Sequence, residues 1–104
     1  RGSPGLVPSS FSEITPKHAV RCLVAGHVQG VWYRAATAQR AEQLSLSGWA
    51  KNLPDGRVEV VIVGESHGIA KLCEWLWEGS SSASVSGITV EVWRDSVSSG
   101  FQTL

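Results

Sequence analysis

Apolar and polar residues follow two different periods along this chain, and the order of the periods predicts the fold. Segments with apolar residues at every second position, or with short apolar runs, predict strands, whereas spacing of three and four residues predicts helices. We expect strands over residues 18–25, 49–52, 57–63 and 87–93, helices over residues 33–47 and 66–79, and a short edge strand around Phe101. The predicted order is β-α-β-β-α-β.

Each predicted helix carries one apolar stripe, as a helix lying on a sheet requires. The first stripe consists of Ala35, Ala38, Ala41 and Leu44, and the second of Ile69, Leu72, Cys73 and Leu76. Two such helices between the strands fit an α+β, ferredoxin-like sandwich, in which both cover one face of an antiparallel mixed sheet. The turn at residues 53–56, Leu-Pro-Asp-Gly, makes the strands on either side antiparallel neighbours.

The first 16 residues are rich in Gly, Pro and Ser and show neither period. We expect residues 1–16 to form a flexible extension, contributed in part by an expression vector, and residues 17–104 to form one domain. A chain of 104 residues with 42% apolar residues supports one core and leaves little room for a second.

The charges of the chain balance, with nine Lys and Arg against nine Asp and Glu. No overall field would therefore hold a polyanion or an acidic membrane surface. Five tryptophans could stack on bases, but the strand over residues 57–63 reads RVEVVIV and lacks the spaced aromatic residues of RNA-binding sheets. The longest apolar runs are also far shorter than the roughly 20 residues of a membrane span. We expect neither a nucleic acid nor a membrane partner.

The two cysteines, Cys22 and Cys73, lie among Val, Leu and Ile and are expected to be buried free thiols. The chain has no Cys-X-X-Cys motif and no secretory apolar segment near its start, which favours a reducing cytoplasm. The histidines, His18, His27 and His67, show no short ligand spacing. A zinc site is therefore not expected, and we predict no metal and no cofactor.

A glycine loop, GHVQGVWYR at residues 26–34, lies between a predicted strand and a predicted helix. Backbone N–H groups in such a turn have no partner in either element, and glycine lets them converge on one point. The helix N-terminus adds partial positive charge, and Arg34 adds a planar guanidinium that suits two phosphate oxygens. An ordinary tight turn followed by a solvated arginine is the alternative, since the loop lacks the established nucleotide-binding patterns.

A second segment, GWAKN at residues 48–52, gives the loop a partner. With both segments the sequence resembles the acylphosphatase family, whose signatures are Gly-X-Val-Gln-Gly-Val-X-Phe/Tyr-Arg and Gly-aromatic-X-Lys/Arg-Asn. The matching residues are Gly26-His27-Val28-Gln29-Gly30-Val31-Trp32-Tyr33-Arg34 and Gly48-Trp49-Ala50-Lys51-Asn52. The resemblance extends from about residue 20 to residue 101. Asn52 follows Arg34 by 18 residues, a spacing that also fits the family.

The resemblance implies an enzyme that hydrolyses the carboxyl-phosphate bond of acyl phosphates to a carboxylate and inorganic phosphate. By similarity, Arg34 binds phosphate and is catalytic, and Asn52 holds the attacking water. The implied phosphate-binding loop consists of Gly26, His27, Val28, Gln29, Gly30 and Val31. Phosphoryl transfer needs mainly positioning and neutralised charge, so these groups could act without a metal.

Several expectations accompany this assignment. His27 is interpreted as a rim residue, and Trp32 and Trp49 are expected to shape the mouth of the site. Inorganic phosphate is expected as product or inhibitor, and the enzyme is expected to be a cytoplasmic monomer. The alternative is a non-catalytic domain that binds acyl or carbamoyl phosphate and acts with a partner. Nothing in the sequence identifies a pocket for the acyl group.

Overall fold

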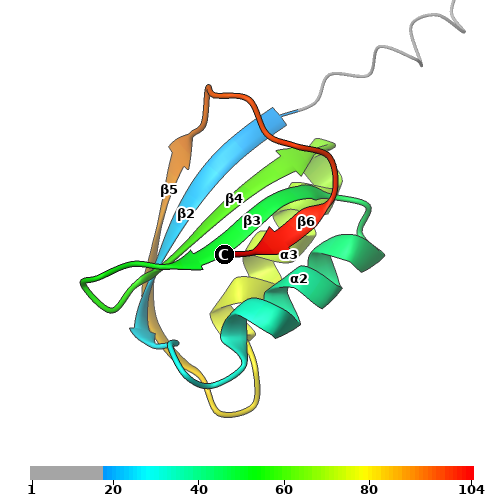
Figure 1. Ribbon diagram of the computed structural model, residues 1–104. Helices are drawn as coiled ribbons and strands as arrows, with labels where there is room; N and C mark the ends of the chain where they lie inside the picture. The colour runs from blue at the N-terminus through cyan, green and yellow to red at the C-terminus, as the bar shows by residue number, and fades with distance from the viewer. Residues whose placement is uncertain (1–17) are drawn as a thin grey trace, which may run out of the picture.

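A five-stranded sheet and two helices form the two layers of the computed structural model, which describes residues 18–104 (Figure 1). The elements are β2 (His18–His27), α2 (Tyr33–Gln43), β3 (Ser47–Asn52), β4 (Val58–Gly64), α3 (Ser66–Glu78), β5 (Ser84–Val92) and β6 (Phe101–Thr103). This order confirms the predicted β-α-β-β-α-β plan with a short C-terminal edge strand. The extension expected over residues 1–16 lies outside the described residues.

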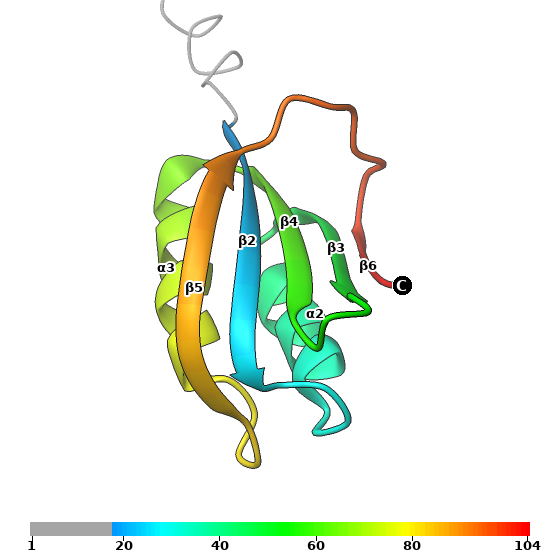
Figure 2. The ribbon, with the colours of Figure 1, turned by 90° about the vertical axis from the view of Figure 1, so that its left-hand side faces the viewer.

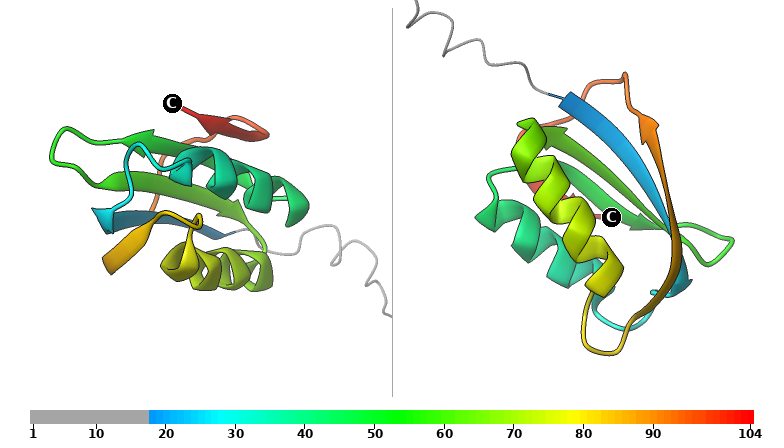
Figure 3. Two further views of the ribbon diagram at one scale, coloured as in Figure 1. Left: turned by 90° about the horizontal axis from the view of Figure 1, so that it is seen from below. Right: turned by 180° about the vertical axis from the view of Figure 1, so that it is seen from behind.

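The strands lie in the order β5-β2-β4-β3-β6. Neighbours are antiparallel except β3 and β6, which are parallel, so the sheet is mixed as predicted. Both helices cover the same face, and Figures 2 and 3 show the opposite face without a helix. None of the helices within residues 18–104 has the length and hydropathy that crossing a membrane requires.

The core lies between the helices and the inward face of the three central strands. Val60 of β4 pairs with Cys22 of β2 and with Ala50 of β3, and all three are fully buried. From α3, Leu72 is also fully buried, and the apolar stripe predicted for that helix is confirmed. Cys22 and Cys73 are free thiols whose sulfur atoms lie 3.9 Å apart, with Cys22 buried and Cys73 half-buried.

The first helix departs from the prediction in its end and in its buried face. It ends at Gln43 rather than Ser47, because Ser45 adopts a left-handed φ of 59° and the chain turns into β3. Ala35, predicted on the buried stripe, is exposed, whereas Thr37 is fully buried. The Thr37 hydroxyl donates to the carbonyl of Tyr33 at 2.7 Å, so its polar group is satisfied inside the core.

The last long strand begins earlier than predicted. The sequence predicts a strand over residues 87–93, but β5 starts at Ser84 and ends at Val92. Its first residues pair with the end of β2, where Gly26 lies opposite Val85 after a register shift. A side chain at Gly26 would meet the backbone of Ser84 at 2.2 Å, so only glycine lets the two strands approach here.

The face without helices carries a network of charged and aromatic side chains around Glu59. Its carboxylate is 2.6 Å from Nε of Arg21 and accepts a hydrogen bond of 3.0 Å from Nε1 of Trp49. Arg21 also contacts the more exposed Glu91 at 3.0 Å. Burial by itself would raise the pKa of Glu59, but the hydrogen bonds from Trp49 and Arg21 outweigh it and hold the pKa below its ordinary value.

We predict that Glu59→Gln lowers the free energy of unfolding at pH 7 by about 1–3 kcal/mol, because the charge-assisted bonds of a largely buried carboxylate are lost. A lowered folded-state pKa stabilises the fold above the ordinary carboxyl value of 4.5, and this contribution disappears as the pH falls through the folded-state pKa. The deficit of the variant should therefore shrink in acid. Urea unfolding of both proteins between pH 7 and pH 3 measures it.

Glu91→Gln provides the control, because the Glu91 side chain is 47% exposed and an exposed ion pair contributes little. A deficit for Glu59→Gln that stays constant across this pH range would contradict the explanation from charge.

Candidate phosphate-binding site

The strand directions bring the two sequence motifs to the same end of the sheet, where β2 and β3 both finish. β2 and β3 are each antiparallel to β4, so they run in the same direction, and β6 is parallel to β3. Val24 of β2 and Asn52 of β3 both pair with Val58 of β4. The glycine loop that follows β2 therefore lies at the end of the sheet where Asn52 is the last residue of β3.

The side chain of Gln29 fixes the loop to the turn between β3 and β4. Its Nε2 donates to the carbonyl oxygens of Leu53 and Arg57, each at 2.9 Å. Leu53 directly follows Asn52, so this amide ties together the two segments that the sequence motifs identify. The sequence does not reveal this contact, because it depends on how the loop folds back over the turn.

Two further contacts hold the loop from the side of α3. The carbonyl of Val31 accepts a hydrogen bond of 2.6 Å from the hydroxyl of Ser80. Tyr33 is buried, and its hydroxyl donates to the carbonyl of Leu76 at 2.6 Å, while burial raises the pKa of this phenol. The side chain of Val28 is 1% exposed and packs in the core. The loop is thus anchored by its side chains and one carbonyl.

Most backbone N–H groups of the loop are left without protein acceptors. Residues 29 and 30 form a turn, which directs the N–H of Val31 towards the carbonyl of Val28, but within residues 18–104 no carbonyl or side chain accepts from the N–H groups of residues 28–30. Helix α2 follows directly; its N-cap residue, Trp32, makes no side-chain cap, and its first turn holds no acidic residue. Gly30 adopts a φ of 75°, and nothing lies within 4 Å of the place where its side chain would be. These features are those of an anion-binding helix N-terminus.

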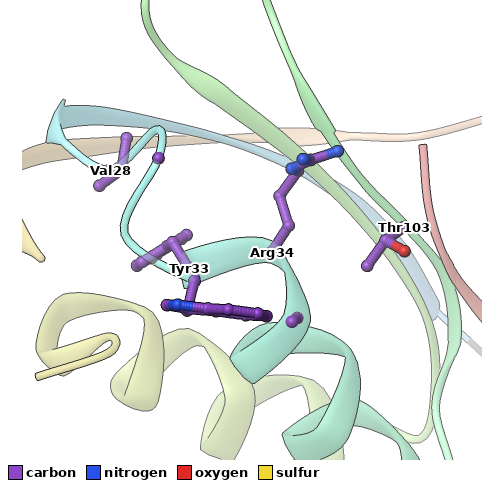
Figure 4. Close-up of a pocket in the computed structure, with 7 residues that line it drawn as sticks. Val28, Tyr33, Arg34 and Thr103 are labelled. Atoms are coloured by element: carbon purple, nitrogen blue, oxygen red, sulfur yellow. The ribbon is translucent and has the colours of Figure 1, made fainter.

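Arg34 lies in the first turn of α2, beside these N–H groups. Its Nη1 donates to the carbonyl oxygen of Leu104, just after β6. A guanidinium has five N–H donors, so this bond fixes its position and leaves others for a ligand. Figure 4 shows the side chain extending from the helix towards the side of the pocket where Thr103 lies. The contact with Leu104 was not predicted from the sequence, since it depends on the parallel pairing of β6.

Asn52 contributes a buried side-chain oxygen that has no partner among the described residues. Its Oδ1 is buried, and no described residue donates to it. A buried amide oxygen without a donor is rare, because it loses its hydrogen bonds to bulk water without replacement. A bound water molecule is the simplest donor for such an atom.

The structure distributes the predicted loop residues between two elements. Gly26 and His27 form the end of β2, paired with Val85 and Ser84, while residues 28–31 form the loop itself. His27 is exposed at this edge. The roles of these six residues towards phosphate stay predictions.

Trp49 does not shape the mouth of this site, contrary to expectation. Side chains of successive strand residues alternate between faces, and Trp49 and Asn52 are three positions apart. The indole of Trp49 therefore lies on the opposite face, where it contacts Glu59 and packs edge-on against Trp93 at a centroid distance of 5.5 Å. Trp32 does line the pocket.

In the part of the chain that the structure describes, His, Cys, Asp and Glu side chains form no group of three that could hold a metal ion.

Comparisons with known proteins agree with this geometry. The family model for acylphosphatase matches residues 20–103. An acylphosphatase of Nitrosococcus oceani is 49% identical over 73 residues, which cover 70% of this chain and 82% of the relative. The structure of an acylphosphatase from Coxiella burnetii matches with a TM-score of 0.80 at 41% identity, over 85% of this chain and 93% of that chain.

A full-length HypF structure, in a phosphate- and nucleotide-bound form, also matches with a TM-score of 0.79 over 96% of this chain. The match covers 12% of that chain at 23% identity, which shows a shared fold only.

Proposed function

The chain belongs to the acylphosphatase family, and from this membership we propose how its residues carry out the family's reaction. As an acylphosphatase, the protein hydrolyses the mixed anhydride between a carboxyl and a phosphoryl group. The products are a carboxylate and inorganic phosphate. The leaving carboxylate is stable, so the enzyme has mainly to hold the phosphoryl group, neutralise its charge and direct water to it.

In this proposal the loop and Arg34 hold the phosphoryl group. The observation that carries it is the set of N–H groups of residues 28–30 that have no acceptor among residues 18–104, next to an uncapped helix N-terminus and a guanidinium. The N–H groups would donate to the phosphoryl oxygens, and Arg34 would supply the permanent positive charge. Charge on the equatorial oxygens would then be stabilised where it develops in the transition state.

Asn52 would position the nucleophile. Its buried Oδ1 would accept a hydrogen bond from a water molecule and hold that water in line with the bond to be broken. An amide cannot take up the proton, which would pass to a phosphoryl oxygen of the substrate as the P–O bond breaks. Because backbone N–H groups and Arg34 supply the positive charge, the reaction would need no metal ion. We also propose a cytoplasmic, monomeric enzyme, and the two free thiols are in keeping with a reducing compartment.

Steady-state hydrolysis of acetyl phosphate in EDTA, with inorganic phosphate as inhibitor, tests this function. We expect turnover well above the rate in buffer and competitive inhibition by phosphate. Phosphate binding without turnover would instead support the non-catalytic alternative, a domain that presents acyl or carbamoyl phosphate to a partner. Loss of turnover in EDTA that returns with added divalent metal would contradict the metal-free mechanism.

A further inference from the structure

The pocket beside the loop extends beyond the groups that would hold phosphate. Its volume is about 410 Å³, and it is lined by Val28, Gly30, Trp32, Tyr33, Arg34, Ala35 and Thr103, with Val28 and Arg34 on opposite sides (Figure 4). A water molecule occupies about 30 Å³ in the liquid, so a phosphoryl group of about five heavy atoms would fill less than half of this space. The remainder is available for the group on the other side of the scissile bond (Figure 4).

Trp32 is the residue in this pocket that folding does not explain. Its side chain is 82% exposed, and among residues 18–104 its indole makes no hydrogen bond and pairs with no other ring. Its backbone has a left-handed φ of 64°, which a bulky residue rarely adopts. The left-handed backbone of this bulky residue lowers stability, and strained residues of this kind gather at functional sites.

We propose that Trp32 forms one wall of an acyl subsite that favours flat, apolar acyl groups, so that aromatic acyl phosphates are the preferred substrates. The proposal rests on the phosphoryl group binding at the loop and Arg34. The acyl carbon is joined to phosphorus through a single oxygen, so the acyl group must lie next to the loop. Trp32 directly follows that loop, and an indole stacks well on an aromatic ring.

The charges around the pocket support an apolar acyl group over an acidic one. Among residues 18–104, Arg34 is the only charged residue in the pocket lining, and the proposal assigns it to the phosphoryl group. A carboxylate on the acyl side would therefore find no second cation there. Apolar contacts come instead from the exposed Ala35, together with the Trp32 ring.

The test compares benzoyl phosphate with acetyl phosphate, using the ratio of their kcat/KM values. Trp32→Gly removes the indole and suits the left-handed backbone, so the fold should persist. We expect the ratio to fall about tenfold, because the aromatic substrate loses a stacking partner that the acetyl group never engages fully. Trp77→Ala is the matched control, since Trp77 is 55% exposed on α3 outside this pocket, and it should keep the wild-type ratio.

Binding of the non-hydrolysable analogues benzoylphosphonate and acetylphosphonate gives a second readout that needs no turnover. The ratio of their dissociation constants should change in the same direction and by a similar factor in Trp32→Gly. An equal loss for both compounds, or an unchanged ratio, would overturn the acyl subsite. If the wild type hydrolyses acetyl phosphate but Trp32→Gly keeps the wild-type ratio, the acyl subsite is contradicted and the proposed function stands. Failure of the subsite is therefore distinguishable from failure of the function.

Discussion

Arg34→Ala should lower kcat/KM for acyl phosphates by at least about a thousandfold, the scale on which arginine contributes to phosphoryl transfer. The variant keeps the loop but removes the permanent charge that would neutralise the phosphoryl oxygens. Its fold should persist, because in the described residues the side chain makes one hydrogen bond, to Leu104, at an exposed position. Initial rates, circular dichroism and urea unfolding measure the three expectations.

Two further variants test this explanation, one at Arg34 itself and one as a control. Arg34→Lys retains the charge but loses the planar fork, so its rate should lie between those of the wild type and Arg34→Ala. Arg40→Ala is the matched control, because Arg40 lies on the same helix, is exposed and does not line the pocket. If Arg40→Ala were as inactive as Arg34→Ala, the loss would come from helix α2 as a whole and not from a phosphate ligand.

Asn52→Ala should lower activity without lowering stability. We expect kcat to fall about a hundredfold or more, because water would no longer be held in line with the scissile bond. Affinity for inorganic phosphate should stay within a few-fold, since the loop and Arg34 remain. The free energy of unfolding should be unchanged or rise by up to about 1 kcal/mol, because a buried oxygen without a protein donor is removed.

Lys51→Ala is the control for this variant. Lys51 is the preceding residue of β3, is exposed, and points to the opposite face of the sheet. Its rate and its phosphate affinity should resemble those of the wild type. A large loss of phosphate affinity in Asn52→Ala would contradict the division of roles, because it would make Asn52 a phosphate ligand and not a water ligand.

The topology of the fold could be predicted because each element carries its own periodic signal. The order of strands and helices follows from apolar spacing, and the position of Leu72 and its neighbours on α3 was confirmed. The phase of α2 could not be fixed in this way, because alanines mark no side clearly. The burial of Tyr33, with its hydroxyl bonded to α3, turns Thr37 inward and leaves Ala35 outside.

The site was predictable in its motifs but not in what holds them. The sequence predicts Arg34 and Asn52 as site residues, and the structure brings their segments to the same end of the sheet. The contacts of Gln29 with the turn carbonyls and of Arg34 with Leu104 join residues far apart in the chain, and no local pattern encodes them. The position of Trp49 follows from strand alternation, which puts its side chain on the face of the sheet opposite Asn52.

The glycines of the loop illustrate how one motif serves two physical purposes. Gly26 lets β2 and β5 approach, because any side chain there would clash with the backbone at Ser84. Gly30 faces open space and is needed for its left-handed φ of 75°. A pattern of two glycines therefore combines a requirement of sheet packing with a requirement of the loop.

Hydrolysis in water enriched in oxygen-18 tests the mechanism most directly. If the loop and Arg34 hold the phosphoryl group and Asn52 directs water to phosphorus, the label must appear in inorganic phosphate and not in the carboxylate. Mass spectrometry of both products after a single turnover, with a sample lacking enzyme as control, reads the outcome. Enzyme-dependent label in the carboxylate would show that water attacks the carbonyl carbon, and it would contradict this account of the site.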